Sequence, residues 1–294
     1  MVSTNASQLS ALSRLFSSGV FREIAKRGQS SLFARLLAQA KISCASDQSV
    51  GDAFDAAFAL LRRSGMRDEY VYRAALTQNI LLGTHSLNTA CMLTEFRAGS
   101  CKADLAILNG TATVYEIKSE RDSLTRLANQ ISNYRKVFAK VYVIVGDGHV
   151  NDVLENTPID IGVMCLTRRH QITTIRNAAD RPDRVCPVTI FESLRSSEAC
   201  EILNGLGVAT PQVPNTMLHS ALRECFAGLA PEVVHQAMVD TLKRTRSLAP
   251  LSDFVVNLPI SLQPAALSIK IRPEDQNRLI TALRTPISSA MDWT

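Results

Sequence analysis

Residues 101–118 read CKADLAILNGTATVYEIK, two strand-like runs joined by an Asn-Gly turn of the kind that favours a β-hairpin. Three charged residues, Asp104, Glu116 and Lys118, interrupt these runs. Residues i and i+2 of a strand share a face, so Glu116 and Lys118 project together. Either hairpin register then places Asp104 opposite residues 115–117. The sequence therefore predicts a patch of two carboxylates and one ammonium group on neighbouring strands.

Two interpretations of this patch compete. Charges on a solvated strand face need no function, whereas like charges that converge on neighbouring strands destabilise a sheet unless a cation lies between them. Magnesium is a hard cation that takes carboxylate and carbonyl oxygens, and Mn²⁺ accepts the same kind of ligand. The second interpretation therefore predicts Mg²⁺ as a cofactor, with Mn²⁺ as a substitute.

The composition is that of an ordinary globular protein. The chain has 294 residues, of which 46% are hydrophobic and 20% charged, enough to bury a core in one large or two smaller domains. Its first residues lack the basic and apolar regions of a signal peptide, and no apolar run reaches the ~18 residues of a membrane span. We therefore expect a cytoplasmic protein with no membrane partner.

Cysteine and histidine usage argues against several kinds of site. The seven cysteines are odd in number, scattered and without a C-x-x-C pair, which is not the pattern of a disulfide framework or a zinc site. Their spacing is also too loose for an iron–sulfur cluster. The five histidines show no ligand spacing. The net charge of +5 is compatible with a polyanionic partner but does not require one.

The periodicity of apolar residues divides the chain into three regions. Residues 1–66 show helical spacing and predict an N-terminal helical region. Residues 67–180 combine helical and strand patterns. Residues 185–294 return to helical patterns and predict a C-terminal helical region. Within this last region, the Gly/Pro/Asn-bearing segment 207–215 is the best candidate for a linker.

The middle region predicts a mixed sheet with helices. A helix precedes three strands, and a second helix over about 122–138 precedes the next strand. Strand patterns cover residues 91–97, 103–108, 112–118, 141–145, 161–167 and 171–176. The first two connections are antiparallel, and the crossover through the second helix should bring 141–145 parallel to the strand that holds Glu116.

The second helix is polar on one side and basic toward solvent. Asp122, Arg126, Gln130 and Tyr134 step by four residues and so predict one polar stripe. Five basic residues between positions 121 and 140 outnumber the single acid, and they are Arg121, Arg126, Arg135, Lys136 and Lys140. A phosphate backbone would therefore find cations beside the carboxylate patch.

These residues together resemble the signature of a known superfamily. Asp104, an eleven-residue gap and then Glu116-Ile117-Lys118 are similar to the PD-(D/E)XK signature of restriction-endonuclease-like nucleases. The segment QISNY at 130–134 is similar to the QxxxY element of their RecB-like branch. The longer pattern resembles a poorly characterised bacterial and phage group within that superfamily.

The resemblance covers about residues 70–170 and implies a fold and an activity. The implied fold is α/β, with a restriction-endonuclease-like αβββαβ core and a mixed central sheet, flanked by the N- and C-terminal helical regions. The implied activity is Mg²⁺-dependent hydrolysis of phosphodiester bonds in nucleic acid, with DNA favoured over RNA. One departure is that Ala103 stands where the signature has proline, a position that varies in such families.

The resemblance also implies roles for single residues. Asp104 and Glu116, with the backbone carbonyl of Ile117, would hold Mg²⁺, and Lys118 would orient or help deprotonate a water molecule. A further acid often completes such a site, and Glu95 is the matching candidate.

Other residues take supporting roles in the same comparison. Glu69 on the preceding helix is a less favoured substitute for the further acid. Gln130 and Tyr134 would position the site or the nucleic-acid strand. The residues expected to contact nucleic acid are Arg121, Arg126, Arg135 and Lys136.

A second function remains open beside the nuclease. It is a catalytically silent module that keeps the fold and binds nucleic acid or another protein. The intact signature argues against decay of the site, but intact residues do not prove turnover, and the flanking helices carry no recognisable motif. Self-association into a homo-oligomer is compatible with both functions.

Overall fold

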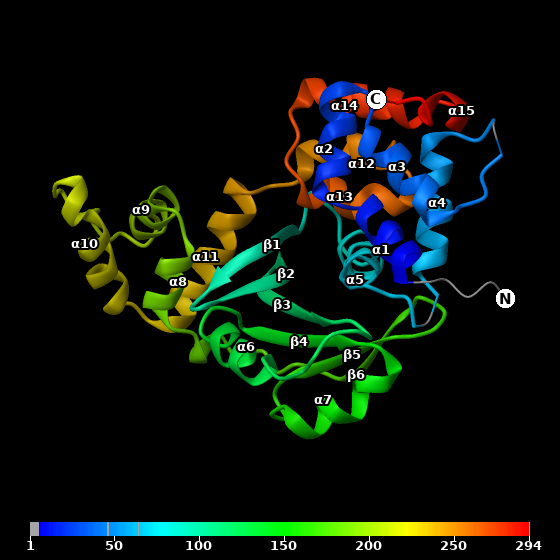
Figure 1. Cartoon of the computed structure of the whole chain (residues 1–294). Coiled ribbons are helices and arrows are strands. Elements are labelled where there is room, and N and C mark those ends of the chain that lie inside the picture. The colour runs from blue at the N-terminus through cyan, green and yellow to red at the C-terminus, as the bar shows by residue number, and fades with distance from the viewer. Residues whose placement is uncertain (1–5, 46, 64, 294) are drawn as a thin grey trace.

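A six-stranded mixed sheet lies at the centre of the computed structural model, which describes residues 6–45, 47–63 and 65–293 (Figure 1). The strands follow one another across the sheet in chain order, β1 to β6. Neighbours pair antiparallel from β1 to β3 and between β5 and β6, and parallel from β3 through β4 to β5. Their bounds are β1 Cys91–Ala98, β2 Cys101–Asn109, β3 Thr111–Lys118, β4 Lys140–Val145, β5 Gly162–Leu166 and β6 Ile172–Arg176. The predicted α/β class, mixed sheet and parallel crossover are confirmed.

The hairpin of β2 and β3 forms as its sequence predicts. Asn109 pairs with Thr111, and Gly110 between them has φ +72°, a backbone conformation that glycine adopts without steric cost. The register then runs back to Leu105 opposite Tyr115. Because side chains alternate along each strand, this register decides which residues of β2 and β3 meet on each face of the sheet.

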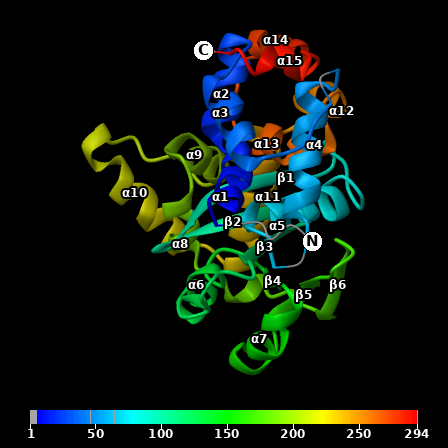
Figure 2. The same cartoon turned by 45° about the vertical axis from the view of Figure 1, so that its right-hand side comes forward.

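Helices cover the two faces of the sheet in two groups (Figures 1 and 2). Leu105, Ile107, Tyr115 and Ile117 belong to a hydrophobic core shared with the first group. The helices of that group are α1 Ala6–Leu15, α2 Ser18–Arg27, α3 Ser31–Ala40, α4 Val50–Leu61, α5 Glu69–Leu76, α12 Ser252–Val256, α13 Gln263–Ser268, α14 Pro273–Leu283 and α15 Ile287–Ala290. A π-helical turn, Thr77–Leu81, extends α5.

The opposite face carries the second core. Ala106, Val114 and Val143 pack there with residues of the second group of helices. These helices are α6 Leu127–Tyr134, α7 Val150–Asn156, α8 Pro187–Ser193, α9 Ser196–Gly205, α10 Asn215–Ala227 and α11 Pro231–Thr245. Burying apolar side chains on both faces explains why β4 reads as a continuous apolar run.

The structure divides the predicted C-terminal region 185–294 between these two cores. Helices α8 and α11 pack on the sheet and α9 and α10 pack against them, whereas α12 to α15 share a core with the N-terminal helices. Val50 N donates to the Thr285 carbonyl oxygen (2.9 Å), and the Arg278 guanidinium donates to the carbonyl of Lys26 (2.8 Å). The candidate linker 207–215 joins α9 to α10 within one packed group, so it does not separate the two parts.

The predicted helix over 122–138 is shorter in the structure. Helix α6 spans Leu127–Tyr134 only. Upstream, the Asp122 carboxylate accepts hydrogen bonds from the backbone N–H (2.8 Å) and the hydroxyl (2.6 Å) of Ser119. This local turn competes with helix, as is typical of short polar side chains that bond nearby backbone. Asp122 therefore does not belong to the predicted polar stripe.

Among the described residues, no helix is both long enough and apolar enough to cross a membrane.

Candidate functional site

The hairpin brings two acidic side chains together where β2 and β3 diverge. Extending the observed register by one residue beyond Leu105 and Tyr115 places Asp104 opposite Glu116. Asp104 Oδ2 accepts a hydrogen bond from the backbone N–H of Ile117 (2.8 Å). The Glu116 side chain is 1% exposed, and Asp104 is half-buried. The structure thus sets the two predicted carboxylates side by side.

Glu116 is the centre of a hydrogen-bonded network. Its Oε1 lies 2.8 Å from the Lys118 ammonium, and its Oε2 accepts a hydrogen bond from the Tyr134 hydroxyl (2.6 Å). The Lys118 ammonium also donates to Gln130 Oε1 (2.9 Å). Lys118 lies beside Glu116 because residues i and i+2 of a strand share a face. Gln130 and Tyr134 are four residues apart on α6, so both side chains face this pair, Gln130 at Lys118 and Tyr134 at Glu116. All five residues predicted to be catalytic therefore lie in one cluster, which we call the carboxylate network: Asp104, Glu116, Lys118, Gln130 and Tyr134.

The electrostatics of the network favour a proton or another cation beside Asp104. Burial and the neighbouring Glu116 carboxylate raise the pKa of Asp104 to about 8. The Ile117 N–H and the Lys118 ammonium oppose this shift, and the Glu69 carboxylate adds to it. Two carboxylates that share a site cannot both ionise cheaply, so one pKa rises unless a cation compensates.

Tyr134 takes part as a hydrogen-bond donor. Burial and the Glu116 carboxylate raise the pKa of its hydroxyl well above the ordinary value for tyrosine. The phenol therefore stays protonated at neutral pH and donates to Glu116. The Lys102 carbonyl oxygen, 2.8 Å away, is an alternative acceptor for the same proton, so the hydroxyl can link α6 to β3 or to β2.

Asn133 positions α6 in a way that sequence reasoning missed. Its Oδ1 accepts a hydrogen bond from the backbone N–H of Ser100 (3.1 Å) in the turn between β1 and β2. A Cβ atom on Gly99, which has φ +59°, would lie 2.3 Å from this same oxygen. The Gly-Ser pair at the turn was the available signal, since only glycine allows so close an approach.

The third acid of the site has two candidates. Glu69, in the first turn of α5, is near enough to Asp104 to raise its pKa. Its carboxylate also pairs with Arg73 four residues later. Glu95 on β1 is exposed, with φ +52°, and does not contribute to the shift of Asp104. The electrostatics thus favour Glu69, whereas the sequence favours Glu95.

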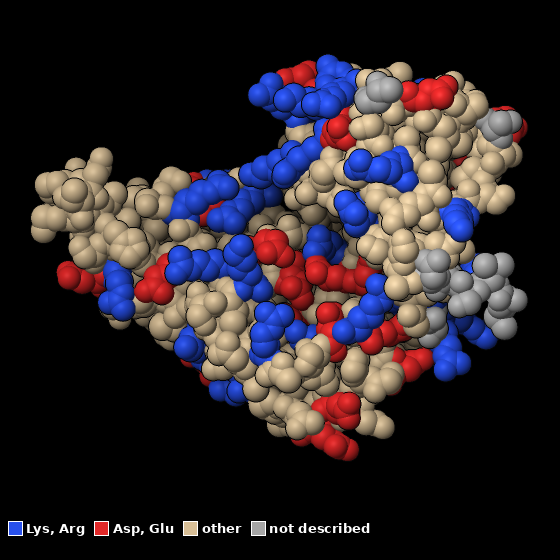
Figure 3. Space-filling view, in the orientation of Figure 1, with Lys and Arg blue, Asp and Glu red and all other residues tan. Residues whose placement is uncertain are grey.

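Of the four residues predicted to contact nucleic acid, two interact with other protein groups and two are exposed. Arg135 pairs with Asp160, and Arg121 donates to the Met66 carbonyl oxygen. Arg126 and Lys136 are exposed. Figure 3 shows acidic side chains gathered in a hollow near the ends of the central strands, with lysine and arginine on either side. This arrangement allows a negatively charged chain to approach between the cations.

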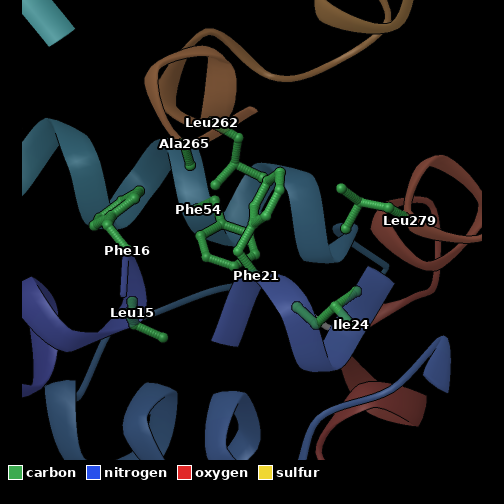
Figure 4. Close-up of a pocket in the computed structure, with 8 residues that line it drawn as sticks. All are labelled: Leu15, Phe16, Phe21, Ile24, Phe54, Leu262, Ala265 and Leu279. Carbon is green, nitrogen blue, oxygen red and sulfur yellow. The ribbon is translucent and has the colours of Figure 1, made fainter. Parts of the chain in front are cut away.

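Two further observations limit where a ligand could bind. An apolar gap between α1, α2, α4, α13 and α14, shown in Figure 4, leaves no room for a water molecule and is a packing feature of the core.

Within residues 6–45, 47–63 and 65–293, no three His, Cys, Asp or Glu side chains form a preassembled metal cluster. The carboxylate network therefore offers two close carboxylates with a third acid nearby.

Comparison with known proteins gives a family and one distant structure. Residues 62–249 match the family model described as Bacteriophage P4 protein cII. Protein cII of Enterobacteria phage P4 is 28% identical over 185 residues, which are 59% of this chain and 66% of that protein. The aligned region thus spans just under two thirds of that relative's length.

Among solved structures, a protein of unknown function from Silicibacter pomeroyi matches at 16% identity and a TM-score of 0.31. The match covers 49% of this chain and 92% of that one. The family match covers a definite set of elements. It starts after α4 and ends before α12, so it contains the sheet and α5 to α11 and leaves out the other helices of the first group.

Proposed function

The chain belongs to the family described as Bacteriophage P4 protein cII, and we propose that it is a divalent-metal-dependent nuclease. Its substrate would be nucleic acid, with DNA favoured over RNA. The observation that carries the proposal is the convergence of Asp104, Glu116 and Lys118 at the divergence of two strands, with Gln130 and Tyr134 bonded to them.

The order of elements around the network supports a restriction-endonuclease-like core. Helix α5 precedes the three antiparallel strands β1 to β3, and α6 leads to β4, which pairs parallel to β3. This order is the αβββαβ arrangement that the PD-(D/E)XK resemblance implies. The residues of the signature fall on β2 and β3, and those of the QxxxY element on α6.

The donor set suits a hard divalent cation. Asp104 and Glu116 supply carboxylate oxygens, the carbonyl of Ile117 supplies a further oxygen, and Glu69 or Glu95 supplies the third acid. Burial and the neighbouring Glu116 carboxylate raise the pKa of Asp104, and a bound cation would offset both effects, which supports this assignment. When bound, Mg²⁺ or Mn²⁺ supplies positive charge that stabilises the phosphate under attack.

The chain's own residues orient the groups of the site. Lys118 is held between Glu116 Oε1 and Gln130 Oε1, so its ammonium has a fixed position from which to orient a water molecule toward a phosphate. Tyr134 holds the other oxygen of Glu116 and thus fixes the rotamer of that carboxylate. Gln130 and Tyr134 therefore act as positioning residues.

One observation favours the catalytically silent alternative. Both oxygens of Glu116 already have partners, and the side chain is 1% exposed. A buried ion pair completed by a tyrosine can serve structure alone. In that case the protein would bind nucleic acid or a protein partner without cleaving it.

A cleavage assay on four substrates separates the two functions. Supercoiled plasmid, linear duplex DNA, single-stranded DNA and RNA are incubated with the protein in Mg²⁺, Mn²⁺ or EDTA. We expect cleavage of at least one DNA substrate in Mg²⁺ or Mn²⁺ and none in EDTA. Absence of cleavage of all four substrates in both metals, from protein that is folded by circular dichroism, would favour the silent module.

A further inference from the structure

A second charged site lies away from the carboxylate network, at the end of α4. It is a pocket of about 280 Å³ between the C-terminal end of α4, with the residues that follow it, and the turn that joins β5 to β6. We call it the arginine pocket. Its lining residues are Ala59, Arg62, Arg63, Arg168, Arg169 and His170.

A buried arginine holds the two walls of the pocket together. The Arg67 guanidinium donates to the Leu166 carbonyl oxygen (2.6 Å) at the end of β5 and to the Arg62 carbonyl oxygen (3.2 Å) after α4. The Arg67 side chain is 1% exposed, with Glu120 at 3.8 Å. The spacing between the walls is therefore set before any ligand arrives, which lowers the cost of binding.

His170 is the buried polar group of the pocket. The residue is 7% exposed, and neither ring nitrogen has a hydrogen-bond partner among the described residues. Its ring packs edge-on against Phe58, with centroids 5.8 Å apart, and its φ is +61°. A buried donor or acceptor without a partner is unfavourable, so a ligand oxygen that reaches the His170 ring would relieve this penalty.

The charges around His170 are positive and only partly compensated. Arg168 lies 3.7 Å from the Asp147 carboxylate, and both side chains are exposed. The Arg62 guanidinium lies over the Phe58 ring, 5.9 Å from its centroid. Four arginines against one carboxylate leave a surplus of positive charge for a multiply charged anion. Burial, with Arg62 and Arg67, also lowers the pKa of His170 to about 4, so its ring is neutral near pH 7 and offers one donor and one acceptor.

We propose that the arginine pocket binds a doubly charged phosphoryl group, such as the terminal phosphate of a nucleic-acid strand or of a free nucleotide. Arginine forks match phosphate oxygens with paired hydrogen bonds, and a terminal phosphate carries about −1.5 to −2 charges near pH 7. This proposal goes beyond cleavage, because anion binding needs neither metal nor turnover.

The position of the pocket fits a strand end. Strands β3, β4 and β5 are parallel, so Lys118 at the end of β3 and Leu166 at the end of β5 lie at the same edge of the sheet. Strand β4 lies between β3 and β5, so the distance from β3 to β5 is two strand spacings, about 10 Å. A nucleic-acid strand held by its terminal phosphate could therefore also reach the carboxylate network.

Binding of matched oligonucleotides in EDTA tests the proposal without cleavage. Three internally labelled single-stranded DNAs differ only in carrying a 5′-phosphate, a 3′-phosphate or two hydroxyl ends, and fluorescence anisotropy gives their affinities. We expect wild type to bind one phosphorylated form about tenfold more tightly than the unphosphorylated form. The Arg168→Ser/Arg169→Ser variant should lose this preference, whereas the charge-matched Arg22→Ser/Arg35→Ser control should keep it.

Inorganic phosphate and a nucleoside monophosphate, titrated calorimetrically, distinguish a free ligand from a strand end. If these bind with the same dependence on Arg168 and Arg169 while the oligonucleotides show no preference, the pocket serves a free phosphate ester. His170→Asn, which tolerates positive φ, should weaken whichever binding is seen by several-fold. The proposal is overturned if no probe binds with a dependence on Arg168 and Arg169, and this outcome says nothing against metal-dependent cleavage.

Discussion

Replacing Glu116 by glutamine is expected to lower the rate of Mg²⁺-dependent cleavage by at least about 10³-fold, the scale of losing a central electrostatic group of an active site. Glutamine keeps the shape of the side chain, and its single amide oxygen can still accept a hydrogen bond from Lys118, while its NH2 group faces the Tyr134 oxygen. It removes the negative charge that a divalent cation needs. Single-turnover cleavage, followed on the DNA substrate that wild type cuts fastest, measures the effect.

Two further substitutions serve as comparisons for this result. Glu69→Gln should reduce the rate by roughly tenfold, if its carboxylate supplies the third acid through its proximity to Asp104. Glu95→Gln removes the same charge from an exposed residue on β1 and is expected to have the smaller effect. Equal rates for wild type and Glu116→Gln would show that the carboxylate network is not the active site. A larger loss in Glu95→Gln than in Glu69→Gln would restore the sequence-based choice of third acid.

The second large effect concerns stability without metal. The pKa of Asp104 is raised to about 8 in the folded protein by burial and by Glu116, against about 3.9 in an unfolded chain. The folded state therefore holds a proton that the unfolded state releases, and stability falls as pH rises from about 4 to about 8. Asp104→Asn removes this loss while its amide oxygen can still accept the Ile117 N–H.

Thermal unfolding in EDTA at pH 5 and pH 9 measures this difference. We expect Asp104→Asn to exceed wild type at pH 9 by about 2 kcal/mol or more, and by clearly less at pH 5. The exposed Asp152→Asn in α7 serves as the control and should follow wild type at both pH values. An Asp104→Asn protein that is less stable than wild type at pH 9 would mean that the two carboxylates do not oppose each other.

Much of the central fold could be predicted because its signals are local. Alternation along β2 and β3, with an Asn-Gly turn between them, indicates the hairpin and brings Asp104 opposite residues 115–117 in either register. The structure selects the register that sets Asp104 opposite Glu116. The spacing of Gln130 and Tyr134 by four residues then places both on one side of α6, although this helix is shorter than its apolar pattern indicates.

Features set by tertiary contacts could not be predicted in the same way. The pattern of residues 185–294 is helical throughout, and nothing local shows that α12 to α15 join the core of the N-terminal helices while α8 to α11 join the core on the other face of the sheet. The nearness of Glu69 to Asp104 depends on how α5 docks on the hairpin. The arginine pocket combines residues about a hundred positions apart, which are linked by Arg67.

Calorimetric titration of Mg²⁺ tests the central claim, that Asp104 and Glu116 share a divalent cation when nucleic acid is present. Two carboxylates and one carbonyl leave positions that Mg²⁺ fills with water or with substrate phosphate, and the Lys118 ammonium opposes binding until a phosphate offsets it. We predict little heat for Mg²⁺ added to the protein alone and a marked gain in affinity with a non-cleavable DNA, in wild type but not in Asp104→Asn. The claim would be contradicted if Mg²⁺ bound tightly to the protein alone and this binding persisted in Asp104→Asn. It would also be contradicted if DNA did not raise the affinity of wild type for Mg²⁺.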